Sequence, residues 1–134
     1  MSKRLLYSLL GIGFLILGAL IYVFLGKGTY IGNLFQALSQ NRNYANEILL
    51  FVRIYLADYL WSLSLTLLLI AVNKDTHKSV ILYAVVSFLL GCAWELCQHI
   101  KIANGTGDIV DVIMYFAGSC SIVTAFYIKG VIKK

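Results

Sequence analysis

The sequence predicts an all-α integral membrane protein, a bundle of four transmembrane helices. About 60% of its 134 residues are hydrophobic and 13% are charged, whereas soluble domains average roughly 45–50% and 25%. The apolar residues gather in four long runs, and a membrane span needs about 20 such residues. Four spans with short loops account for the length, so residues 1–134 are expected to form a single membrane domain.

The four apolar runs predict spans at about residues 5–25, 50–72, 80–100 and 108–128. The first run is longer than the apolar core of a signal peptide, which favours a retained span over a cleaved signal. Within it, Gly11 and Gly18 lie seven residues apart on one helix face and predict a close-packing seam.

The longest polar connection joins the first two spans, from Gly26 to Glu47. Apolar residues recur at helical spacing in its middle, at Ile31, Leu34, Phe35 and Leu38. This pattern fits a short helix lying in the membrane interface, and a plain loop is the alternative.

The distribution of Lys and Arg over the loops predicts the orientation. Seven basic residues flank one side of the predicted bundle: Lys3, Arg4, Lys74, Lys78, Lys129, Lys133 and Lys134. Three flank the other side: Lys27, Arg42 and Lys101. The positive-inside rule therefore predicts a multi-pass protein with both termini in the cytoplasm.

The charge pattern argues against a nucleic-acid-binding protein, and the positions of the cysteines argue against a disulfide framework. The net charge is +5, but the basic residues are scattered between apolar runs and form no basic face, so no nucleic-acid partner is expected. Cys92, Cys97 and Cys120 all fall inside apolar runs, and we interpret them as small core residues. The sequence contains no motif that predicts a cofactor.

Polar residues inside the spans point to a site, because a charge at the centre of a span costs about 2.5–3.5 kcal/mol. They recur every three or four residues and form one stripe on each of the last three spans. The stripes are Tyr55, Asp58, Ser62 and Thr66; Ser87, Gly91, Glu95, Gln98 and His99; and Asp108, Asp111, Tyr115 and Gly118. We expect their carboxylate ends to converge on the outer half of the bilayer.

The predicted cluster combines four carboxylates with Arg53: Asp58, Glu95, Asp108 and Asp111. Such a set is stable only if some carboxyls are protonated, if a cation lies among them, or if Asp108 and Asp111 lie at the water interface. The cation would be a divalent metal ion with oxygen ligands or a cationic group of a ligand.

Each residue also has a purely structural interpretation. Asp108 and Asp111 resemble an acidic cap at a helix N-terminus. Glu95 and Gln98 would then be hydrogen-bonding glue between helices. Arg53 would reach the interface as a snorkelling residue or pair with Asp58 or Glu95, and His99 would be an interfacial residue.

The short motifs of the third and fourth spans resemble those of VanZ-like membrane proteins. Glu95 and Gln98 match an E-x-x-Q pattern, and the segment from Gly105 through Asp108 and Asp111 to Gly118 matches G-x-x-D-x-x-D-x(6)-G. Arg53 and the segment 58–61 are similar to the upstream part of small relatives. The resemblance covers about residues 50–120.

That resemblance implies four or five transmembrane helices in a bacterial cytoplasmic membrane and a role in the cell envelope. The family's namesake is associated with low-level resistance to a glycopeptide antibiotic. Two positions depart from the family pattern: Thr106 stands where a basic residue is frequent, and Tyr115 where an asparagine is frequent. The ligand would differ if those side chains contact it in the family.

Three functions remain open at this stage. In the first, the cluster binds the head group of an envelope lipid or a lipid-linked cell-wall component. Its ligand-binding residues would be Arg53, Asp58, Glu95, Gln98, Asp108 and Asp111, with Arg53 on a phosphate or carboxylate. In the second, two carboxyls act as acid and base in a membrane hydrolase or transferase. In the third, Glu95 and Asp58 relay protons in a transporter or accessory subunit.

Overall fold

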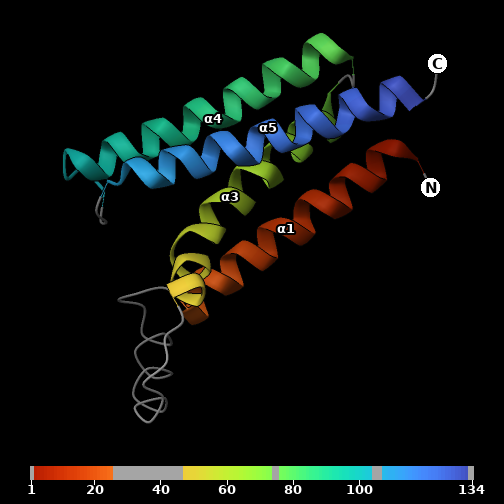
Figure 1. Ribbon diagram of the computed structural model, residues 1–134. Coiled ribbons are helices and arrows are strands. Elements are labelled where there is room, and N and C mark those ends of the chain that lie inside the picture. The colour runs from red at the N-terminus through yellow and green to blue at the C-terminus, as the bar shows by residue number, and fades with distance from the viewer. Residues whose placement is uncertain (1, 26–46, 74–75, 104–106, 133–134) are drawn as a thin grey trace.

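The computed structural model describes residues 2–25, 47–73, 76–103 and 107–132. Over these residues the only regular secondary structure is helical, with α1 at Lys3–Leu25, α3 at Glu47–Val72, α4 at His77–His99 and α5 at Ile109–Ile132 (Figure 1). Each helix contains a stretch of at least 18 residues that is apolar enough to cross a membrane. The prediction of an all-α, four-span, multi-pass membrane protein is therefore confirmed, whereas the predicted interfacial helix lies outside the described residues.

The helix ends differ from the predicted spans by a few residues. Helix α3 begins at Glu47 and α5 continues to Ile132, because a helix extends beyond the apolar stretch that crosses the hydrocarbon. Helix α4 begins after Thr76, whose hydroxyl oxygen accepts a bond from the Ser79 N–H at 3.3 Å. It ends at His99, and Lys101, two residues beyond, adopts a left-handed conformation with φ of 61°. The Lys101 N–H then donates to the Gln98 carbonyl at 3.0 Å, as in a helix C-cap.

Successive helices run in opposite directions, so the starts of α1 and α4 lie at the same end as the ends of α3 and α5. Figure 1 shows both termini at this end, which we call the terminal end. Helix α3 contacts each of the other three helices, and α4 packs against α5. The opposite end, which we call the loop end, therefore holds the start of α3, the end of α4 and the start of α5.

Helices α1 and α3 pack along the predicted glycine seam. A Cβ placed on Gly11 would lie 2.8 Å from Leu68 Cγ, and one on Gly18 would lie 3.1 Å from Trp61 Cδ1. The Ser64 hydroxyl crosses the same seam and donates to the Gly11 carbonyl at 2.7 Å. The seam prediction is confirmed, because the absent side chains let the two backbones approach closely.

Buried hydroxyls hold α3, α4 and α5 together at mid-length. The Ser62 hydroxyl lies 2.7 Å from the Tyr115 carbonyl, to which it donates, and 2.6 Å from the Ser119 hydroxyl. The Ser87 hydroxyl donates to the Ser62 carbonyl at 2.9 Å. Hydrogen bonds of this kind contribute about 0.6 kcal/mol each on average between membrane helices, so they align the polar stripes more than they stabilise the fold.

The apolar core lies towards the terminal end of the bundle. Its buried members come from all four helices: Tyr7, Leu63, Leu67, Ile70, Ala71, Val80 and Ile122. The Tyr7 ring packs on the Phe126 ring with centroids 5.4 Å apart. Large apolar side chains also cover the outer faces, such as Leu9 at 54% exposed and Leu89 at 56%. A surface of this kind suits a lipid environment.

Candidate functional site

Four carboxyl groups meet at the loop end of the bundle. They are Asp58 on α3, Glu95 on α4, and Asp108 and Asp111 at the start of α5. All four lie close enough to interact electrostatically. We call Asp58, Glu95, Asp108 and Asp111 the carboxylate cluster. The prediction that the three polar stripes bring these residues together is confirmed.

Tyr115 connects the three helices within the cluster. Its hydroxyl donates to Asp58 Oδ1 at 2.8 Å and lies 3.4 Å from Glu95 Oε1. The ring is buried, and a Cβ on Gly91 would collide with it. A phenol has one proton to donate, so the shorter bond to Asp58 is the main one and Glu95 is the alternative acceptor.

Asp108 caps helix α5. Its Oδ1 accepts a bond from the Val110 N–H at 3.0 Å, and its own backbone N–H donates to Glu95 Oε2 at 3.2 Å. Its Oδ2 lies 3.4 Å from the hydroxyl of Tyr55, which donates to it. The capping interpretation is therefore confirmed for Asp108, and the bond to Glu95 ties the start of α5 to the end of α4.

Glu95 is the most enclosed member of the cluster, with 6% of its surface exposed. Its Oε2 accepts a bond from the Asp108 N–H, and its Oε1 is the alternative acceptor for the Tyr115 hydroxyl. Its role as a hydrogen-bonding link between helices is confirmed, because both of these groups belong to residues at or near the start of α5, while Glu95 lies on α4.

Asp111 differs from Glu95 because one of its oxygens has no partner. Its Oδ1 is buried, and no hydrogen bond reaches it from the described residues. The Asp111 and Asp58 carboxyl groups are within hydrogen-bonding reach of each other. A bond between two carboxyls requires that one of them carries a proton, as in paired catalytic aspartates. Asp58 and Asp111 therefore form a carboxyl pair.

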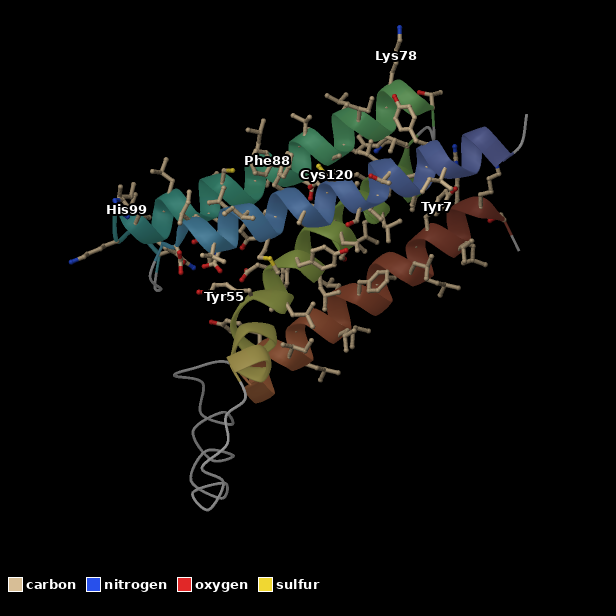
Figure 2. All side chains as sticks on the ribbon, in the orientation of Figure 1. Tyr7, Tyr55, Lys78, Phe88, His99 and Cys120 are labelled. Atoms are coloured by element: carbon tan, nitrogen blue, oxygen red, sulfur yellow. The ribbon has the colours of Figure 1, made fainter. Side chains whose placement is uncertain are left out.

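The remaining candidate residues are not joined to the cluster by described contacts. Gln98 is partly buried at the loop end, and no side-chain hydrogen bond connects it to the described residues. His99 is exposed at the tip of α4 (Figure 2). The Arg53 side chain lies outside the described part of the chain, so its predicted contact with Asp58 or Glu95 stays a prediction.

The metal alternative finds no support in the arrangement of ligands. Among the described residues, no group of three or more His, Cys, Asp and Glu side chains is placed to hold a metal ion. The Asp58–Asp111 pair offers oxygen ligands from two residues, while Glu95 and Asp108 are engaged in bonds to N–H and hydroxyl groups. The cluster is therefore better suited to hydrogen-bond donors than to a bare divalent cation.

Tyr55 and Tyr115 are the residues that the predicted site omits. Both occupy positions on the polar stripes, three residues before Asp58 and four residues after Asp111. This spacing places them on the same helix faces as the carboxylates. It is the sequence pattern from which their part in the site could have been predicted. Their hydroxyls supply the donors that an all-carboxylate cluster lacks.

The described cluster offers several acceptor atoms and two phenol donors at the end of three spans. It can accept hydrogen bonds from hydroxyl or ammonium groups, and its carboxyl pair can take up or release a proton.

Comparison with known proteins gives no match to a family model, to a curated protein or to a solved structure. The resemblance to VanZ-like proteins therefore stays a prediction from the motif residues.

Proposed function

We propose that this protein binds the polar head group of an envelope lipid, or of a lipid-linked cell-wall component, at the carboxylate cluster. The observation that carries the proposal is the buried Oδ1 of Asp111, to which no N–H or O–H group of the described residues donates a hydrogen bond. A buried acceptor without a hydrogen bond costs about 1–3 kcal/mol. A hydroxyl or ammonium group of a ligand, bonded to this atom, would remove that cost.

The depth of the cluster supports a head group as the ligand. Asp111 is the third residue of the span Ile109–Ile128. At 1.5 Å per residue it lies about 3 Å, less than one helical turn, inside the end of that span. The polar interfacial region of the bilayer, which holds the lipid head groups, begins next to this level. In the proposal, Arg53 contacts the phosphate or carboxylate of the same ligand.

The proposed cellular location comes from the sequence. In the proposal, the protein is a VanZ-like protein of a bacterial cytoplasmic membrane, with both termini inside and the cluster in the outer half of the bilayer. A ligand in the outer leaflet would be a membrane lipid or a lipid-linked cell-wall component. Binding of this ligand by the protein would change the susceptibility of the cell to glycopeptides and other agents that act on the cell wall.

The test replaces one carboxyl at a time. Asp111→Asn should leave the melting temperature in detergent unchanged or slightly higher, because the amide keeps the shape of the carboxyl and can donate to Asp58. Glu95→Gln should lower stability by about 1 kcal/mol, because an amide has one acceptor oxygen where the carboxylate has two. Both variants should abolish the change in glycopeptide susceptibility that we expect on overexpression of the wild type.

His99→Gln is the matched control, because His99 is exposed at the same end and outside the cluster. It should retain the full phenotype at equal membrane abundance. If the carboxyl variants unfold, and the protein that remains keeps the phenotype, the cluster has a structural role and the proposal is wrong.

The carboxyl pair favours one second candidate function. Asp58 and Asp111 are within hydrogen-bonding reach, which is the arrangement used when two carboxyls act as acid and base in a hydrolase or transferase. An enzyme of this kind should lose all turnover of a lipid-linked substrate in either Asp58→Asn or Asp111→Asn. A binding protein should instead lose affinity by degrees across the cluster, with no product formed by the wild type.

A further inference from the structure

A second polar site lies at the terminal end of the bundle. A cavity of about 390 Å³ opens between the start of α1 and the end of α3. Pockets for small ligands measure roughly 300–1,000 Å³. Its walls are formed by Ser2, Lys3, Arg4, Tyr7, Ile70 and Asn73. The cavity shares no residue with the carboxylate cluster, which lies at the opposite end.

The walls of the cavity are apolar at the floor and cationic at the mouth. Ile70 is fully buried and Tyr7 is 8% exposed, whereas Lys3 and Arg4 are both exposed. Tyr7 follows Arg4 by three residues and Lys3 by four, so the two basic side chains and the ring share one face of α1. No member of the carboxylate cluster lines the cavity. The site therefore combines positive charge with an apolar base.

The position of the cavity along the bundle indicates which part of a membrane lipid lies next to its mouth. Helix α1 begins at Lys3 and α3 ends at Val72, so the mouth lies where two spans leave the hydrocarbon. Phosphate groups of membrane lipids occupy this level. Basic pockets between transmembrane helices bind anionic head groups, and a guanidinium holds a phosphate through two parallel hydrogen bonds.

We propose that this cavity binds the head group of an anionic phospholipid. Arg4 and Lys3 contact the phosphate, and the lipid backbone lies beside Tyr7. The position of the mouth favours a lipid over free phosphate, because a lipid can keep its acyl chains in the adjoining hydrocarbon while its phosphate meets the basic side chains. The proposal depends neither on the function of the carboxylate cluster nor on which way the protein faces.

The experiment titrates the full chain, purified in a neutral detergent, with phosphatidylglycerol, phosphatidylcholine or inorganic phosphate. Bound lipid is counted by native mass spectrometry, and the melting temperature is recorded in parallel. Phosphatidylglycerol should bind and raise the melting temperature, and the other two probes should do neither. Lys3→Gln/Arg4→Gln should weaken binding roughly 30-fold, or about fivefold for each basic side chain removed.

Lys78→Gln is the matched control. Lys78 is exposed at the same end and points away from the bundle (Figure 2), and it does not line the cavity. This variant should bind phosphatidylglycerol like the wild type. An equal loss in Lys78→Gln would mean that the lipid responds to general surface charge, and the cavity would not be the site.

A second variant avoids removing positive charge near the membrane. Asn73→Asp places a carboxylate at the mouth of the cavity, where Asn73 is exposed, and should weaken phosphatidylglycerol binding by repulsion while the fold persists. Undiminished binding in this variant and in Lys3→Gln/Arg4→Gln would overturn the proposal. Binding of inorganic phosphate with the same affinity would show an anion site that does not recognise lipid, which would overturn it as well.

Discussion

At the scale of single residues, Tyr115 has the largest structural role in the carboxylate cluster. Its hydroxyl serves Asp58 and Glu95 from a third helix, and its ring fills the space left by Gly91. The cluster of this protein is therefore built around a tyrosine.

Removing only the hydroxyl tests this role. Tyr115→Phe keeps the ring but leaves Asp58 Oδ1 and Glu95 Oε1 without their donor, so we expect a loss of about 1–3 kcal/mol of stability. The measurement is thermal unfolding in detergent. Tyr22→Phe, at a position that is 60% exposed, should unfold like the wild type. A Tyr115→Phe variant as stable as that control would show that water replaces the hydroxyl and that Tyr115 does not organise the cluster.

At the scale of helices, close backbone contact brings α5 onto α3. A Cβ on Gly118 would lie 2.5 Å from the Tyr59 carbonyl oxygen and 3.1 Å from Ser62 Cβ. The Tyr59 hydroxyl also crosses between the same two helices and donates to the Ser121 hydroxyl at 2.9 Å. This contact sets the rotation of α5, and the rotation directs Asp111 and Tyr115 towards Asp58.

A single added methyl group tests the contact. Gly118→Ala forces backbone atoms apart, and overpacking of this kind costs about 1–3 kcal/mol, so the melting temperature should fall. Gly13→Ala is the control on α1, because nothing lies within 4 Å of a Cβ at that position. It should be neutral or slightly stabilising, since alanine is the better helix former. Equal melting temperatures for the two variants would contradict the packing argument.

At the scale of the whole molecule, opposite charges lie at opposite ends of the bundle. The carboxylate cluster is at the loop end, and Lys3, Arg4 and Lys78 are at the terminal end. The alternating helix directions bring both termini to one side of the membrane (Figure 1). The positive-inside rule then predicts that the terminal end faces the cytoplasm.

Cysteine labelling tests the orientation in a background in which Cys92, Cys97 and Cys120 are replaced by alanine. Ile102→Cys, at a position 76% exposed at the loop end, should react with an impermeant thiol reagent added to intact cells. Thr76→Cys, exposed at the terminal end, should react only after the membrane is opened. The reverse pattern would place the carboxylate cluster on the cytoplasmic side and exclude an outer-leaflet ligand.

The number of spans, their approximate ends and the convergence of the polar stripes could be predicted from the sequence. Each of these depends on a local property: the length of an apolar run, or a repeat every three to four residues along one helix. The glycine seam on α1 is local in the same sense, because Gly11 and Gly18 mark a face whatever partner packs on it.

How the carboxyl groups share their partners depends on the packing of the helices. The rotation and crossing of three helices determine that Asp108 caps α5 and that Glu95 binds the Asp108 N–H. They also determine that Asp111 Oδ1 receives no bond from an N–H or O–H group of the described residues. A stripe states which residues face the bundle, but a rotation of a few tens of degrees changes which oxygen meets which hydroxyl. The basic cavity at the terminal end is likewise formed by α1 and α3 together. Residues 63 to 71 positions apart in the sequence meet there, because the start of α1 and the end of the antiparallel α3 lie at the same level. No local pattern specifies this.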